Sequence, residues 1–187
     1  MNKWNRKNAR WMLLYAVLYA LVSAIVCFTG AIHPVFFVCY QVTAGILLTG
    51  IVICAFSRVK APGAAVCLAL AMILLLFIIG DAVAWHVIPL LVIAVLAEVI
   101  RAAAGYSWTG DVIAAAVMTF STFGYYGQIW FNRAYTYACA VEEMPAGYGD
   151  GLMAVSPIWT LPLVILIGTA ASVIVSHVTA KLFGLEQ

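Results

Sequence analysis

Charged side chains are scarce in this sequence. Of its 187 residues, 9 are Lys or Arg and 7 are Asp or Glu, so that only 9% are charged. A soluble domain carries about 25% charged residues. Hydrophobic residues make up 66% of the chain, and the mean hydropathy is +1.10. Too few polar groups are present to meet water on every side, which excludes an ordinary soluble domain and indicates a membrane protein.

Sequence signatures of ATP hydrolysis and metal binding are also absent. There is no GxxxxGK[ST] motif, so we expect that the chain does not hydrolyse ATP itself. The cysteines show no CxxC spacing and are interpreted as small buried hydrophobic residues, which predicts neither a metal site nor a disulfide framework. We expect no cofactor and no nucleic-acid partner. The five cysteines are Cys27, Cys39, Cys54, Cys67 and Cys139.

Ionisable residues are nearly absent from the apolar segments, although they are the usual mark of catalysis or proton relay inside a membrane. A CAAX-type protease needs paired glutamates within helices, whereas Glu142 and Glu143 lie in a polar stretch. A rhomboid-type enzyme needs a GxSx motif in a span, a setting that neither Ser121 nor Ser156 has. We therefore expect no enzyme, and an intramembrane enzyme and a non-transporting scaffold remain the alternatives to transport.

Long uncharged runs predict where the chain crosses the membrane, because a helix needs about 20 apolar residues to span a core about 30 Å thick. The runs are continuous and lack strict polar alternation, which favours helices over barrel strands. Pro34 suits the first position of a helix. The sequence predicts one all-α domain over residues 1–187, a bundle of six membrane helices at about residues 11–29, 34–56, 61–80, 82–99, 112–132 and 152–177.

Basic residues collect on one side of this expected bundle. With six spans, that side holds Lys3, Arg6, Lys7, Arg10, Arg58, Lys60, Arg101 and Lys181, and Arg133 lies opposite, with Asp81, Glu142, Glu143 and Asp150. Cytoplasmic loops carry the excess of Lys and Arg, so we expect both termini in the cytoplasm of a multi-pass protein of the bacterial cell membrane. A cleaved signal peptide is the competing interpretation of the basic start, but residues 11–29 are long for its apolar core.

The outer side gathers polar and aromatic residues near the ends of the expected helices. Trp and Tyr commonly anchor membrane proteins at the interface, while a ligand pocket combines aromatic walls with a few polar groups. The candidate ligand-binding residues are His33, Asp81, Trp85, His86, Tyr125, Tyr126, Gln128, Trp130, Asn132, Arg133, Tyr135, Met144 and Trp159.

Arg133 is the one basic residue expected on the outer side. Its guanidinium suits a carboxylate or phosphate of the ligand, and an ion pair with Glu142 or Glu143 is the alternative. Asp81 and His86 are expected to converge across a short loop.

Histidine and methionine on the outer side also suit a metal-tetrapyrrole cargo, because imidazole and thioether groups are axial ligands. His33, His86 and Met144 are the candidates. Histidines bonded to backbone or water are the alternative.

Small residues form a strip on the first expected helix, where Ala16, Ala20 and Ala24 recur every four residues. Such a strip lets another helix approach closely, either within the bundle or on a partner membrane protein. On the inner side, Glu98 and Arg101 are spaced to pair at the end of a helix.

Several segments, taken in order, resemble the Trep_Strep family, over about residues 32–181. They are His33-Pro34, Ala97–Arg101 with Gly105-Tyr106, the run from Phe123 to Tyr135, and Ser156–Trp159. One departure is Ala134, which follows Arg133 where many relatives have an acidic residue.

The resemblance implies a substrate-binding (S) component of an energy-coupling factor (ECF) importer, with six helices and both termini inside. It implies a transmembrane coupling subunit and two cytoplasmic ATPases as partners. The implied cargo is a micronutrient, either vitamin-like or tetrapyrrole/haem-like. The strip of Ala16, Ala20 and Ala24 is similar to the AxxxA motif by which S components dock on the coupling subunit, which favours docking over internal packing.

Overall fold

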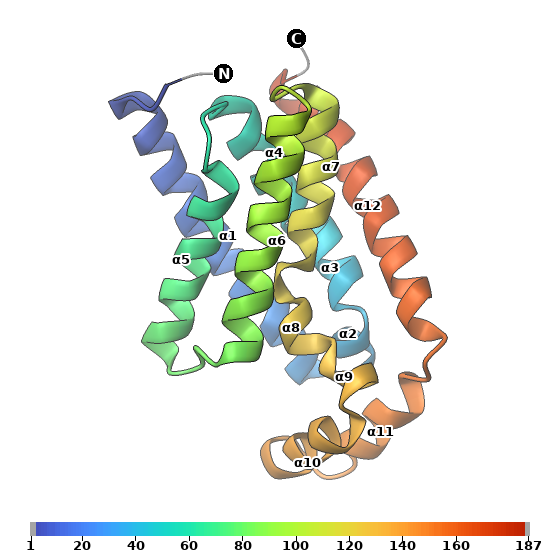
Figure 1. The fold of residues 1–187 in the computed structure, drawn as a ribbon. Coiled ribbons are helices and arrows are strands. Elements are labelled where there is room, and N and C mark those ends of the chain that lie inside the picture. The colour runs from blue at the N-terminus through green and yellow to red at the C-terminus, as the bar shows by residue number, and fades with distance from the viewer. Residues whose placement is uncertain (1–2, 186–187) are drawn as a thin grey trace.

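The computed structural model describes residues 3–185, which form a bundle of helices with both chain ends at one end of the bundle (Figure 1). Three helices of the described residues are long and apolar enough to cross a membrane: α1 (Arg6–Ile32), α6 (Ala84–Ala103) and α12 (Thr160–Phe183). The apolar α5 (Ala64–Ile79) has 16 residues. Helices α1, α5 and α6 begin and end close to where the uncharged runs predict, whereas α12 begins and ends later than predicted.

Two of the expected membrane helices are broken. The first is divided into α2 (Pro34–Val38), α3 (Tyr40–Leu47) and α4 (Thr49–Arg58), and α3 and α4 meet at a bend of 42°. The second is divided into α7 (Trp108–Met118), the 3-10 helix η1 (Thr119–Thr122), α8 (Phe123–Tyr126) and α9 (Gln128–Phe131). The expectation of six continuous membrane helices is therefore met only in part.

The polar loop predicted before the last helix contains two helices, α10 (Arg133–Glu143) and α11 (Tyr148–Val155). They lie at the end of the bundle opposite the termini and are called the outer cap below (Figure 1). The last helix begins at Thr160 rather than near residue 152, because residues 152–155 end α11 and Pro157 lies in the break that follows.

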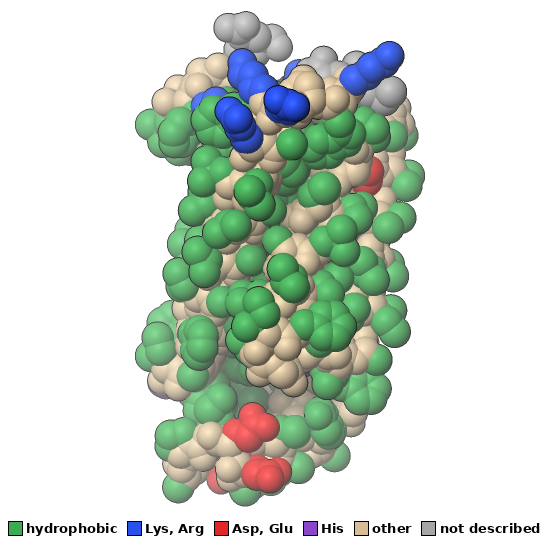
Figure 2. Space-filling view, turned by 90° about the vertical axis from the view of Figure 1, so that its left-hand side faces the viewer, with side chains coloured by type: hydrophobic (Ala, Val, Ile, Leu, Met, Phe, Trp, Pro, Cys, Tyr) green, Lys and Arg blue, Asp and Glu red, His purple; other side chains and the backbone are tan. Residues whose placement is uncertain are grey.

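The surface of the molecule is divided along the bundle axis. Lys and Arg gather at the end that holds the termini, a wide hydrophobic belt follows, and most of the acidic side chains in this view lie at the outer cap (Figure 2). Large apolar side chains of the belt are exposed, among them Leu13 (67%), Leu74 (62%) and Leu166 (68%). A belt of this kind has its natural environment in lipid.

The alanine strip is covered by the protein's own helices. Ala16 and Ala20 are each 7% exposed on the face of α1 that packs against α5 and α4, and Ala24 lines a cavity. In this conformation the alanine strip therefore serves packing within the protein and not docking on a partner. Docking of a partner on this face would require α1 to move away from its neighbours.

A buried ion-pair group joins three helices at the basic end. Arg101 pairs with Glu98 at 3.4 Å, as expected, and its Nε donates to Asp111 at 2.8 Å. A second guanidinium nitrogen donates to the carbonyls of Phe56 and Val59 at 3.3 and 3.1 Å. The fully buried guanidinium thus has partners on several sides, which is the condition for burying a charge without a large penalty.

A candidate ligand-binding cavity

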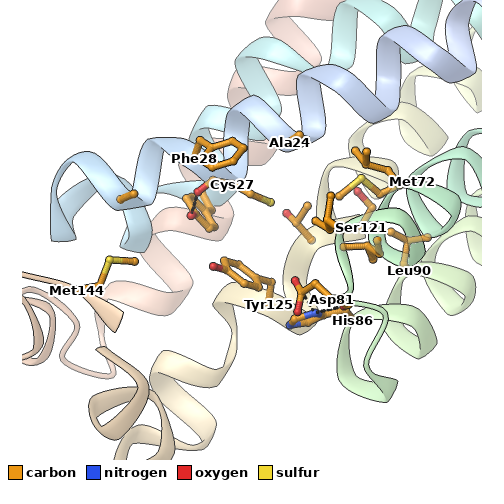
Figure 3. Close-up of a pocket in the computed structure, with 16 residues that line it drawn as sticks. Ala24, Cys27, Phe28, Met72, Asp81, His86, Leu90, Ser121, Tyr125 and Met144 are labelled. Carbon is orange, nitrogen blue, oxygen red and sulfur yellow. Dashed lines mark hydrogen bonds and ion pairs between the residues drawn. The ribbon is translucent and has the colours of Figure 1, made fainter. Parts of the chain in front are cut away.

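Two adjoining cavities lie between the bundle and the outer cap. The inner compartment, of about 260 Å³, is bounded by α1, α5, α6, η1 and α8 (Figure 3). The outer compartment, of about 310 Å³, lies beneath the outer cap. Asp81, His86, Tyr125 and Met144 line both. All four were predicted from the sequence as ligand-binding residues, and the structure brings them together.

The inner compartment has mainly apolar walls. Its lining includes Cys27, Phe28, Met72 and Leu90 together with Ala24 (Figure 3). Polar groups at this depth are few. Ser121 accepts a hydrogen bond from Tyr19 at 2.5 Å, whereas the buried Thr122 hydroxyl has no partner among the described residues.

The outer compartment is more polar and aromatic. Of the predicted residues, it adds Trp85, Gln128 and Tyr135 to the four shared ones. The sequence prediction missed further lining residues from the bundle and the outer cap, which are Phe37, Val83, Thr136, Cys139, Ala140, Glu143, Tyr148 and Leu152.

Asp81 and His86 converge as expected, at the turn between α5 and α6. Helix α5 ends at Gly80, whose φ of +79° is the left-handed conformation that glycine adopts most readily. His86 Nδ1 lies 3.3 Å from Asp81 Oδ2 and 3.1 Å from the Asp81 carbonyl oxygen. Both oxygens only accept hydrogen bonds, so Nδ1 carries a proton and donates it to them.

Aromatic rings surround Tyr125. Its ring centroid lies 5.1 Å from that of His86, 5.5 Å from that of Phe37 and 6.0 Å from that of Tyr40. The hydroxyl of Tyr40 donates to the carbonyl of Cys27, which ties this wall to α1. Phe37 and Tyr40 lie in an uninterrupted apolar run, and nothing in that run marks them as pocket residues.

Gly124 sets the distance between α8 and α6. A Cβ on Gly124 would lie 1.8 Å from the carbonyl oxygen of Trp85 and 2.8 Å from Pro89 Cγ. Pro89 has no N–H to bond the Trp85 carbonyl four residues earlier, so this carbonyl is left facing α8. The glycine permits the close approach that places Tyr125 beside His86.

Two predicted residues are buried in the bundle instead of lining the cavities. Tyr126 donates to Gln41 Oε1 at 2.5 Å, and Gln41 in turn donates to Thr119 Oγ1 at 2.7 Å. Trp130 Nε1 donates to Thr160 Oγ1 at 3.1 Å. These side chains hold broken helices together.

Arg133 does not lie in either cavity. Its guanidinium donates to the carbonyls of Ser156 at 2.5 Å and Met153 at 3.1 Å, where it caps the end of α11. It forms no ion pair with Glu142 or Glu143 among the described residues. The predicted role in binding an anionic ligand group is therefore not supported by its position.

The remaining predicted residues also lie elsewhere. His33 Nδ1 accepts a hydrogen bond from the Val35 N–H at 3.2 Å and so caps α2, as the backbone-bonded alternative describes. Asn132 is exposed before α10, and Trp159 is 63% exposed. No group of three or more His, Cys, Asp or Glu suited to a metal occurs in the part of the chain that the structure describes.

The carboxylates of the outer compartment act electrostatically on its tyrosines. The pKa of Tyr135 in α10 is raised, first by the neighbouring Cys139 and further by the negative charges of Glu143 and Asp81. Both acids therefore influence the same compartment. Among the described lining residues of the two cavities, none is Lys or Arg.

The apolar belt, the long apolar helices and the separation of charge define an integral membrane protein that crosses the bacterial cell membrane several times. Residues 10–184 match the family model described as hypothetical bacterial integral membrane protein (Trep_Strep), and the chain belongs to this family. No curated protein and no solved structure matches the chain.

Proposed function

We propose that this chain is the substrate-binding component of a bacterial membrane importer and that the two adjoining cavities bind its cargo, a small organic micronutrient. The observation that carries the proposal is the cavity pair at the acidic end, shared by Asp81, His86, Tyr125 and Met144. Apolar walls with a few convergent polar groups are typical of sites for small molecules, which occupy about 300–1,000 Å³.

The charge distribution supports an outward-facing site. Short cytoplasmic segments are rich in Lys and Arg, and the basic end of the molecule holds both termini. In this orientation the termini are cytoplasmic, and the outer cap and the cavities face the outside of the cell.

Transport needs a source of energy that this chain lacks. We propose that it acts as an ECF-type S component with a transmembrane coupling subunit and two cytoplasmic ATPases, on the basis of the resemblance and the missing GxxxxGK[ST] motif. Because Ala16 and Ala20 are buried, docking through the alanine strip would accompany a displacement of α1. Recovery of the tagged chain from its native membrane without any ATPase subunit would contradict the proposed association with ATPases.

The surroundings of Ser121, which lines the inner compartment, favour ligand binding over catalysis. Ser121 is hydrogen-bonded by the Tyr19 hydroxyl rather than by a general base.

The test is to identify what the full chain carries when it is purified in detergent from its native membrane. We expect a small molecule to be extracted and detected by mass spectrometry at close to one per chain. Ala24→Trp, which fills the inner compartment, should lose this molecule. Val17→Trp is the matched control, because Val17 lies on the same helix but is 48% exposed on the outer surface.

Retention of the molecule by Ala24→Trp, or its absence from the unmodified protein, would contradict the proposed site. Equal loss from both variants would show that bulk on α1, and not occupation of the cavity, is responsible. The absorbance spectrum of the same sample distinguishes a tetrapyrrole from a colourless cargo.

A further inference from the structure

The charges that line the cavities are of one sign. Asp81 lines both compartments and Glu143 the outer one, while no Lys or Arg occurs among the described lining residues. Arg133, the basic residue expected on this side, is held by the Ser156 and Met153 carbonyls. A carboxylate or phosphate on the cargo would meet repulsion here without a compensating partner.

Glu143 keeps its negative charge unpaired. Asp81 Oδ2 lies 3.3 Å from His86 Nδ1, whereas the Glu143 carboxylate forms no ion pair among the described residues. An unpaired carboxylate at the cavity favours a ligand that brings donors and positive charge.

The aromatic walls favour the same kind of ligand. The ring centroid of Tyr125 lies 5.5 Å from that of Phe37 and 5.1 Å from that of His86, and Trp85 also lines the outer compartment. Faces of aromatic rings attract cations within about 6 Å of the centroid, which is how quaternary ammonium ligands are recognised.

The inner compartment adds a second, independent constraint. Its walls are largely apolar. The group that enters this compartment therefore has an apolar body.

We propose, on the basis of the importer function above, that the cargo is an organic cation with an apolar or aromatic body. Its positive group lies in the outer compartment between Asp81, Glu143 and the ring of Tyr125. Its body extends into the inner compartment, between the apolar walls. Anionic micronutrients are excluded by the same charges.

The experiment measures binding of three small probes to the full chain in nanodiscs by titration calorimetry, after removal of the native occupant. The probes are the cation benzyltrimethylammonium, its uncharged carbon analogue neopentylbenzene, and the anion phenylacetate. We expect the cation to bind at least about tenfold more tightly than either of the others, because an aromatic wall and an unpaired carboxylate both favour it. The occupant extracted from the native protein should likewise carry positive charge at neutral pH.

Glu143→Gln and Asp81→Asn should each weaken binding of the cation about five- to tenfold and leave the neutral probe within about twofold. Glu142→Gln is the matched control, since it removes the same charge one residue away from a lining residue and should change nothing. The Glu143→Gln substitution is not expected to disturb folding, because the Glu143 side chain forms no ion pair among the described residues.

Equal affinity for the cation and its neutral analogue, or tighter binding of phenylacetate, would overturn the proposal. A native occupant that is anionic overturns it as well but leaves the proposed importer function intact. Charge-dependent binding of the cation by a chain that carries no native occupant would instead support the cation site and contradict the importer function.

Discussion

At the residue scale, the cavity depends on two residues that never touch a ligand in this account. Gly124 allows α8 to reach the Trp85 carbonyl, and Pro89 leaves that carbonyl without its usual intrahelical donor. Backbone packed this closely cannot shift as a flexible side chain can. The position of Tyr125 against His86 therefore follows from the absence of a Cβ one residue earlier.

Gly124→Ala should lower the free energy of unfolding by about 1–3 kcal/mol, the usual cost of inserting a methyl group into packed structure. It should also weaken binding of the native occupant, because α8 must move away from α6. Unfolding by denaturant and occupancy by mass spectrometry are the measurements. Gly151→Ala is the control: its Cβ would lie 3.4 Å from Pro34 Cγ, an ordinary contact, and its effect should be small. Equal effects of the two substitutions would show that the close approach is unimportant.

At the scale of elements, two broken helices meet in the middle of the bundle. A chain of hydrogen bonds runs from Tyr126 in α8 to Gln41 in α3 and on to Thr119 in η1. Thr119 also bonds back to the Ala116 carbonyl at 2.6 Å, as hydroxyl residues do where helices bend. Polar side chains at the two breaks thus bond one another inside the protein, as a membrane interior favours.

Tyr126→Phe should cost about 1–3 kcal/mol of unfolding free energy, because the buried Gln41 carbonyl oxygen loses its donor. Tyr137→Phe is the matched control, since it removes an exposed hydroxyl that bonds Asp150 at 3.0 Å. Chemical denaturation of both variants in detergent measures the difference. A cost for Tyr126→Phe no larger than that for Tyr137→Phe would contradict the role assigned to this chain of hydrogen bonds.

The sequence predicted these elements unevenly, for physical reasons. Hydropathy and the positions of the charged residues located α1, α6 and the C-terminal part of α12, because lipid exposure requires continuous apolar surface. The same signals could not reveal the breaks at Cys39 or Thr119, because both lie inside uncharged runs. Near the second break the Thr119 hydroxyl accepts a hydrogen bond from Gln41 of α3, and a contact of that kind depends on tertiary structure.

The candidate binding site, too, could be predicted only in part, because several of its contacts depend on tertiary structure. Asp81 and His86 stand five residues apart across a turn, so local sequence brings them together, as expected. Arg133 was expected to bind an anionic ligand group or to pair with Glu142 or Glu143, but its guanidinium donates to the carbonyls of Ser156 and Met153, which lie twenty or more residues away. Glu143 was assigned to a loop, and only the folding of α10 over the bundle places it at the cavity.

At the scale of the whole molecule, the distribution of charge and the position of the cavities indicate the same orientation in the membrane. The basic end holds both termini, the apolar belt follows, and the cavities lie beneath the acidic outer cap (Figures 1 and 2). A binding component that takes cargo from outside the cell needs its site at the end away from the basic residues. We therefore expect that the cavity is occupied and that it is reached from outside the cell.

Labelling of the Cys139 thiol tests this expectation directly, because Cys139 lines the outer compartment and is half-buried. With the other four cysteines replaced by serine, intact cells are treated with a membrane-impermeant maleimide, with and without the extracted occupant. A Lys181→Cys protein in the cysteine-free background reports whether the reagent reaches the opposite end of the molecule. The account predicts that Cys139 is labelled from outside, that the occupant slows this labelling, and that position 181 reacts only after permeabilisation. Labelling of Cys139 only from inside, or at a rate that the occupant leaves unchanged, would contradict it.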